Sequence, residues 1–129
     1  MMKKESYNVG SQQIADRIDE ESEGVEIGVW KGDTTEKFSK KAGHVHAVDS
    51  WAVTQSDDFL AMVNKYAAMF NIEPTRESFA IFYDTVYDSV VKRFADTNVT
   101  IYRMTSDDWF LQNTKTDYDW VYIDGDHSY

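Results

Sequence analysis

The last residues of the chain place chemically active side chains directly after an apolar run. Residues 121–123 are followed by Asp124, Asp126 and His127. Two carboxylates can bind a hard divalent metal, and an imidazole that titrates near neutral pH can act as a general base. The apolar run is a predicted strand, and ligands of open α/β sheets bind beyond the carboxyl ends of strands. The alternative interpretation is a polar turn without a chemical role.

A second candidate is the glycine-bearing turn that follows the predicted strand 24–28. Gly28 and Gly32 enclose Trp30 just before a predicted helix. Such a turn lets a ligand approach the backbone and the free amides of a helix N-terminus. A dinucleotide fingerprint needs glycines where Trp30 and Asp33 stand, which disfavours a nicotinamide-dependent oxidoreductase. A cofactor that carries an amine and a carboxylate does not need the full glycine pattern, and an ordinary strand-to-helix turn is the alternative.

Asp49 ends the second predicted strand, 49 − 28 = 21 positions after Gly28. In doubly wound nucleotide-binding sheets an acidic residue about 20 positions on accepts hydrogen bonds from the ribose hydroxyls. The spacing favours that role over a simple loop aspartate. Trp51 lies two residues further on and can cover an adenine face, although an aromatic residue there is as often part of the packing.

The third predicted strand ends in a polar turn that contains Ser106 and Asp107. In a sheet of this kind the turn flanks the same pocket, so both side chains can meet an adenine amino group. Alternatively, Ser106 or Asp107 caps the helix that follows. His44 and His46, at the start of the second strand, are expected to pack or to contact solvent rather than to bind a metal.

Hydrophobic periodicity indicates the elements that hold these groups. Predicted strands cover 24–28, 44–49, 99–104 and 118–123, and predicted helices cover 10–21, 33–42, 56 to the break at Pro74, 77–95 and 107–111. Asp33 and Glu36 fit a capping box at the start of the second helix. Strands that alternate with helices predict a parallel, Rossmann-like α/β sheet.

Composition limits the class of function. The 129 residues suit one domain, and the net charge of −10 argues against nucleic-acid binding. The absence of cysteine excludes disulfides, thiol catalysis and cysteine-bound zinc. No apolar run approaches the ~18 residues of a membrane span, and no secretory signal is visible, so a cytoplasmic protein is expected.

The order of these segments resembles that of class I S-adenosylmethionine-dependent methyltransferases. The resemblance rests on GVEIGVWKG (24–32), AVDSW (47–51), TSD (105–107) and YIDGDHSY (122–129). The last segment is the most specific, and it is similar to the branch that contains macrolide-sugar O-methyltransferases and cephalosporin-hydroxylase-like proteins. The resemblance spans residue 24 to the end, with 50–78 as a helical elaboration after the second strand.

The resemblance implies a single but incomplete domain over 1–129, a three-layer Rossmann-like sandwich. Its partial parallel sheet has the order 3-2-1-4 and lacks the later strands. The implied cofactor is S-adenosylmethionine, with a divalent metal such as Mg²⁺ as a further possibility. The implied cofactor-binding residues are Glu26, Gly28, Trp30, Gly32, Asp49, Ser50, Trp51, Ser106 and Asp107. Asp124 and His127 would be catalytic, and Asp124 would also be a metal ligand.

The resemblance also implies an activity and partners. We expect methyl transfer to a hydroxyl of a small molecule or sugar, with the chain holding mainly the cofactor-binding half. The alternative is a non-catalytic adenosine-cofactor-binding or interaction module, from a truncated or split gene. An exposed fourth strand invites pairing with a second copy or with a complementing chain. Neither a nucleic acid nor a membrane is an expected partner.

Overall fold

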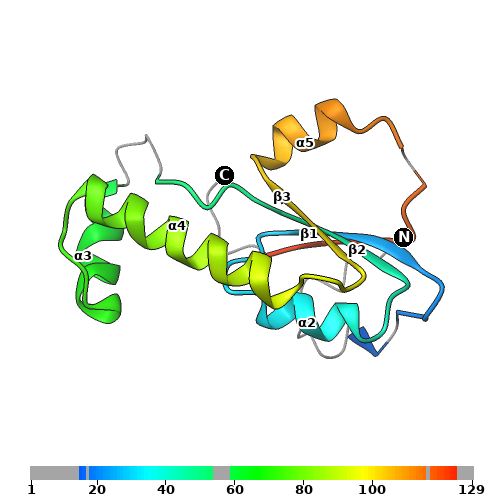
Figure 1. The fold of residues 1–129 in the computed structure, drawn as a ribbon. Coiled ribbons are helices and arrows are strands. Elements are labelled where there is room, and N and C mark those ends of the chain that lie inside the picture. The colour runs from blue at the N-terminus through cyan, green and yellow to red at the C-terminus, as the bar shows by residue number, and fades with distance from the viewer. Residues whose placement is uncertain (1–14, 17, 54–58, 116, 125–129) are drawn as a thin grey trace.

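The computed structural model describes residues 15–16, 18–53, 59–115 and 117–124 (Figure 1). The strands are β1 (Glu23–Ile27), β2 (His44–Asp49), β3 (Val99–Arg103) and β4 (Trp120–Ile123). The helices are α2 (Asp33–Ser39), α3 (Phe59–Phe70), α4 (Arg76–Arg93) and α5 (Ser106–Gln112). Half of the predicted helix over 10–21 lies outside the described residues, and the prediction is wrong for 18–21, which are not helical.

The described strands form one parallel sheet in the order β3-β2-β1-β4. Val25 of β1 pairs with His46 of β2 and with Val121 of β4. All strands therefore end at the same edge of the sheet, where their following loops meet. This topology confirms the predicted Rossmann-like α/β fold and the predicted strand order.

Helices cover both faces of the sheet (Figure 1). On one face, Phe38 of α2 and Val90 of α4 pack against Val45 and Ala47 of β2. On the other face, Trp109 of α5 belongs to a second cluster, whose sheet residues are Val25, Ile27 and Val48. Alternate positions of each strand point to opposite faces, and both faces carry buried apolar residues because helices cover both.

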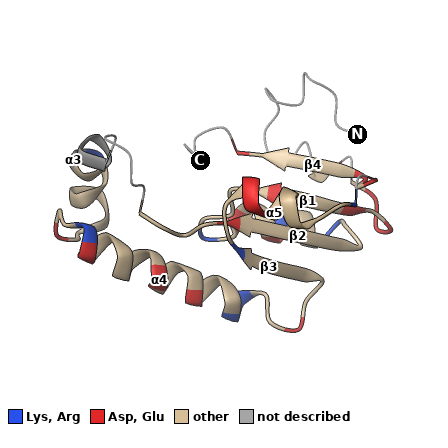
Figure 2. Cartoon of the chain, turned by 90° about the horizontal axis from the view of Figure 1, so that it is seen from above, with Lys and Arg blue, Asp and Glu red and all other residues tan. Residues whose placement is uncertain are grey.

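Helices α3 and α4 project beyond the sheet as a pair (Figure 1). Pro74 separates them as predicted, and the Thr75 hydroxyl caps α4 by accepting a hydrogen bond from the Ser78 amide at 3.1 Å. Val63 of α3 and Phe79 of α4 share a small apolar cluster that joins the two helices. Acidic positions lie along α4 and at the start of α5 (Figure 2).

The predicted caps of two helices are wrong by one or two residues. Gly32, not Asp33, is the N-cap of α2; it has φ 92° and makes no side-chain capping bond. Thr105, not Ser106 or Asp107, caps α5 by accepting a hydrogen bond from the Asp108 amide at 3.1 Å. In the described part of the chain, no helix has the length and apolar character needed to cross a membrane.

Candidate functional site

Three carboxylates converge at the carboxyl edge of the sheet. Glu26 is the penultimate residue of β1 and Asp49 is the last residue of β2. Asp124 directly follows β4, and its amide donates to the Ile27 carbonyl at 3.0 Å. The parallel order with β1 at the centre brings these three side chains together although they are far apart in the sequence.

Glu26 is fully buried, and its carboxyl group is only half satisfied. Its Oε1 accepts a hydrogen bond from the Thr35 hydroxyl on α2, whereas its Oε2 is buried with no hydrogen-bond partner among the described residues. Burial, together with the nearby charges of Asp124 and Asp49, raises the pKa of Glu26 to about 8. The side chain is therefore mostly protonated at neutral pH, and a cationic group placed beside Oε2 would ionise it.

The turn from Gly28 to Gly32 uses left-handed backbone at three positions. Gly28 has φ 91°, Trp30 has φ 56° and Gly32 has φ 92°. A Cβ on Gly32 would lie 2.7 Å from Cε2 of Phe94, so a side chain there meets both steric and conformational resistance. The glycines predicted from the sequence thus shape this turn; their contact with a cofactor remains a prediction.

The Asp49 carboxylate holds the loops after β1 and β2 together. Its Oδ2 accepts from the amides of Val29 and Trp30, each at 3.0 Å, and its Oδ1 accepts from the Trp51 amide at 2.9 Å. Among the described residues, three of its roughly four acceptor positions are therefore occupied, which leaves one for a hydroxyl donor. The predicted ribose contact stays a prediction, to which the structure adds a role in shaping the loops.

The two tryptophans of these loops are packed side chains. Trp51 is 1% exposed, lies 5.2 Å from Tyr87 between ring centroids, and donates its indole N–H to the Trp30 carbonyl at 2.9 Å. The Trp30 ring packs against Phe82 and Tyr83 of α4. This geometry fits the packing alternative for Trp51, and cofactor contacts of Trp30, Ser50 and Trp51 remain predictions.

Ser106 and Asp107 form the first turn of α5, directly after the β3 end. Ser106 is half-buried and Asp107 is exposed. The Met104 amide donates to the Asp49 carbonyl at 3.0 Å, which ties this turn to the β2 loop. The topology therefore brings both residues to the same edge as Asp49, where their adenine contacts remain predicted.

The divalent metal predicted on Asp124 gains no support. Asp126 and His127 lie outside the described residues, so the catalytic role predicted for His127 is untested. Within the described ranges, no group of three or more His, Asp or Glu side chains is arranged to hold a metal ion. Asp49 already accepts hydrogen bonds from three backbone amides, which leaves few of its oxygen lone pairs for a Mg²⁺ ion.

The sequence interpretation missed two arginines that tie α4 and β3 to the site loops. Arg93 Nη1 donates to the Lys31 carbonyl at 3.0 Å and to Asp33 Oδ1 at 2.9 Å. Arg103 Nη2 donates to the Trp51 carbonyl at 2.9 Å and also bonds Asp84. Only the folded arrangement brings these partners together, since 52 to 62 positions separate each arginine from the carbonyl it bonds.

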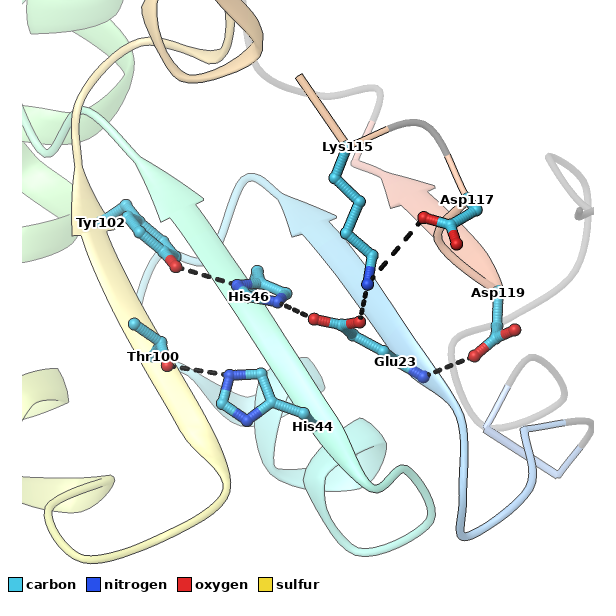
Figure 3. A network of polar contacts seen from close by, with 8 residues as sticks. All are labelled: Glu23, His44, His46, Thr100, Tyr102, Lys115, Asp117 and Asp119. Carbon is cyan, nitrogen blue, oxygen red and sulfur yellow. Dashed lines mark hydrogen bonds and ion pairs between the residues drawn. The ribbon is translucent and has the colours of Figure 1, made fainter. Parts of the chain in front are cut away.

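A second polar network lies on the α5 face of the sheet (Figure 3). His46 bridges Tyr102 at 2.9 Å and Glu23 at 2.6 Å, and Lys115 bonds the other Glu23 oxygen. The hydrogen bonds from Lys115 and His46 lower the pKa of Glu23 to about 2. His44 bonds Thr100 at 2.9 Å. Both histidines are therefore packed and hydrogen-bonded, as expected from the sequence.

Comparison with protein families gives one match, to a model described as a methyltransferase domain, over residues 25–129. No curated protein sequence matches the chain significantly. Among solved structures, SMU.1697c from Streptococcus mutans, titled as a methyltransferase candidate in complex with SAH, aligns with TM-score 0.51 and 12% identity. A dimethyladenosine transferase from Plasmodium falciparum aligns with TM-score 0.50 and 14% identity.

These alignments include most of this chain but only part of each neighbour. They cover 95% of the chain and 52% of the S. mutans protein, and 88% of the chain and 30% of the P. falciparum protein. The chain thus spans about half and about a third of their lengths. At these identities the structural neighbours establish the shared fold alone.

Proposed function

The chain belongs to this family of methyltransferase domains, and on that premise we propose that it binds S-adenosylmethionine at the carboxyl edge of the sheet. The proposed reaction is methyl transfer to a hydroxyl of a small molecule or sugar. The neighbour with bound SAH, the demethylated product of that cofactor, supports the choice of ligand.

The observation that carries the proposal is the buried Oε2 of Glu26, which has no hydrogen-bond partner among the described residues. Burying a polar atom without a hydrogen-bond partner costs folding free energy, and native structures contain few such atoms. Asp49 and Asp124 lie close enough to raise the pKa of this group, so the edge is electronegative. S-adenosylmethionine carries an ammonium group and a sulfonium group, whose positive charges complement such a cluster.

The residues would divide the cofactor between them. Glu26 would hold the amine and Gly28 would leave room for the amino-acid end. Asp49 would accept from a ribose hydroxyl, and Ser106 with Asp107 would meet the adenine. When bound, the cofactor supplies an electrophilic methyl group on a positively charged sulfur.

Asp124 and His127 would act on the acceptor. Asp124 lies at the end of β4, next to the cluster, and would orient the acceptor hydroxyl. His127 would accept the hydroxyl proton as the oxygen attacks the methyl carbon. Orienting the oxygen in line with the breaking carbon–sulfur bond would contribute to the rate through proximity.

A non-catalytic, cofactor-binding module is the second candidate. It requires only cofactor-binding residues at the sheet edge, among them Glu26 and Asp49, which the structure brings together. Both candidates require cofactor binding, and only the first requires turnover by this chain.

Isothermal titration calorimetry with SAH tests the shared requirement. We expect binding in the ~1 μM to 1 mM range that is ordinary for enzyme ligands. Asp49→Ala should weaken it, whereas Asp88→Ala, an exposed carboxylate on α4, should leave it unchanged. No detectable binding would reject both candidates. Transfer of a labelled methyl group to a hydroxylated acceptor would then separate catalysis from binding.

A further inference from the structure

Two tryptophans at the proposed site adopt a backbone conformation that bulky residues avoid. Trp30 has φ 56° and Trp51 has φ 41°, both in the left-handed region. Such conformations persist only where surrounding contacts over-determine them, and they cluster at functional sites. The contacts that hold Trp51 in this conformation can therefore also shape the proposed site beside it.

Arg103, the last residue of β3, supplies several of these contacts. Its Nη2 donates to the Trp51 carbonyl at 2.9 Å, and its Nε donates to the Ser50 carbonyl at 3.4 Å. Asp84 of α4 accepts from the same Nη2, and the guanidinium carbon lies 4.7 Å from the ring centroid of Tyr87. Asp84 and the Tyr87 ring thus fix the planar guanidinium, which donates hydrogen bonds to the carbonyls of two consecutive residues.

Trp51 transmits this constraint to Asp49. The Trp51 amide donates to Asp49 Oδ1 at 2.9 Å, and the indole N–H donates to the Trp30 carbonyl at 2.9 Å. Asp49 Oδ2 in turn accepts from the Val29 and Trp30 amides. A shift of Trp51 would therefore move both the Asp49 carboxylate and the turn after β1.

We propose that Arg103, braced by Asp84, is a positioning residue that holds the 49–51 loop in the conformation that receives the ribose of the cofactor. The proposal rests on the proposed function and extends it to two residues, Arg103 and Asp84, that were not assigned a cofactor contact. Arg103 acts through Trp51 on Asp49, and α4 contributes the brace.

We expect the same contacts to make little difference to global stability. The side chains of Arg103 and Asp84 are 34% and 61% exposed, and exposed ion pairs stabilise folded proteins only weakly. A residue with a merely structural role would change stability and affinity together. A positioning role predicts a fall in affinity at nearly constant stability.

The test compares SAH binding to the wild-type chain with binding to Arg103→Gln, Asp84→Ala and Asp84→Asn. If Arg103→Gln leaves about one molecule in ten in the competent conformation, its Kd rises roughly tenfold. Asp84→Ala should show part of that effect, and Asp84→Asn, which keeps an acceptor oxygen, should show less. Lys92→Gln removes a positive charge from the same helix and should bind as the wild type does.

A spectroscopic measurement separates local order from affinity. In ¹⁵N-resolved NMR of the free protein, the Trp51 indole N–H should shift and exchange faster in Arg103→Gln, with β1 amides unchanged. The positioning role would be overturned if Arg103→Gln bound SAH as tightly as the wild type does. It would also be overturned if the loss of affinity were accompanied by a matching loss of stability, seen as a lower melting temperature. Should Arg103→Gln fail to fold, Asp84→Ala decides by the same criteria. Failure of the wild type itself to bind SAH would instead reject the proposed function.

Discussion

Glu23 and Glu26 lie three positions apart on β1 and meet opposite surroundings. Glu23 accepts hydrogen bonds from Lys115 and His46, which lower its pKa to about 2. Glu26 is buried beside Asp124 and Asp49, and its pKa is raised to about 8. The alternation of side chains along the strand places one glutamate on the α5 face and the other on the α2 face.

Glu26 should make the chain less stable as the pH rises. Its pKa is about 8 in the folded state against 4.5 for an ordinary glutamate, so between these values the folded state binds a proton that the unfolded state has lost. The free energy of unfolding should therefore fall between pH 4.5 and 8, by an amount on the order of a few kcal/mol. Urea titrations across this range should show that the fall disappears in Glu26→Gln. An unchanged pH dependence would contradict the assigned burial.

Glu23 should affect the free energy of unfolding in the opposite direction as the pH rises, and over a lower pH range. Its stabilisation is fully present above pH 4.5 and is lost as the pH falls towards 2, because the carboxylate must be protonated before the network breaks. Glu23→Gln should flatten the acid limb of the stability curve and leave the region above pH 5 with the same slope. A loss of stability of equal size at every pH would point to packing instead of charge.

For single residues, the sequence predicted the place of a residue in a strand or loop better than its hydrogen-bond partners. The residue pattern of 44–49 predicted correctly that Asp49 ends a strand, whereas the ribose contact predicted from its spacing to Gly28 remains a prediction. It did not predict that three backbone amides occupy the Asp49 carboxylate, because such bonds depend on the loop conformation. Thr35 as the partner of Glu26 was missed for the same reason.

At the scale of the elements, β4 pairs with β1 at Gly24, where the packing leaves no room for a side chain. A Cβ on Gly24 would lie 1.9 Å from Cε2 of the Trp120 ring, which is itself 4% exposed and packed against Phe38. The Trp120 indole N–H also donates to the Ser22 hydroxyl at 3.2 Å. The position of β4, and with it that of Asp124, depends on the absence of a side chain at Gly24.

Gly24→Ala should therefore displace Trp120 and loosen β4. Overpacking of this kind costs typically about 1–3 kcal/mol, measurable as a lower urea midpoint. The double variant Gly24→Ala/Trp120→Leu should cost less than the sum of the two single changes, because the smaller side chain makes room for the methyl group. Strict additivity would contradict the proposed contact.

The elements themselves follow closely from the sequence. Alternating apolar runs predicted β1 to β4, and Pro74 predicted the break between α3 and α4. The helix starts were less accurate, since a left-handed Gly32 and the Thr105 hydroxyl displaced the expected caps. The backbone conformation of a glycine and the orientation of a hydroxyl group depend on local structure, which hydrophobic periodicity does not predict.

At the scale of the whole molecule, the outer side of β4 carries no partner strand within the described residues. Ile123 of this edge strand is 49% exposed. Unprotected edges of this kind pair with other chains, so we propose self-association or a complementing chain at this edge. The net charge of −10 opposes unspecific association but does not block the strand edge.

Ile123→Lys should reduce such association, because a charge on an edge strand opposes strand addition. Sedimentation velocity over a concentration series should show a larger monomer fraction for this variant than for the wild type. Leu111→Lys is the matched control, since Leu111 is 81% exposed but belongs to helix α5 and not to the edge strand. Equal effects of both substitutions would indicate unspecific hydrophobic contact in place of strand pairing.

We propose that the buried Glu26 carboxyl group receives the cationic end of the cofactor. Calorimetric titration with SAH at pH 7, in two buffers of different ionisation enthalpy, tests it most directly. With a free-state pKa of about 8, Glu26 is mostly protonated at that pH, and a bound ammonium should release close to one proton. We predict that release for the wild type and none for Glu26→Gln. Binding with the same proton count in both proteins would contradict the claim.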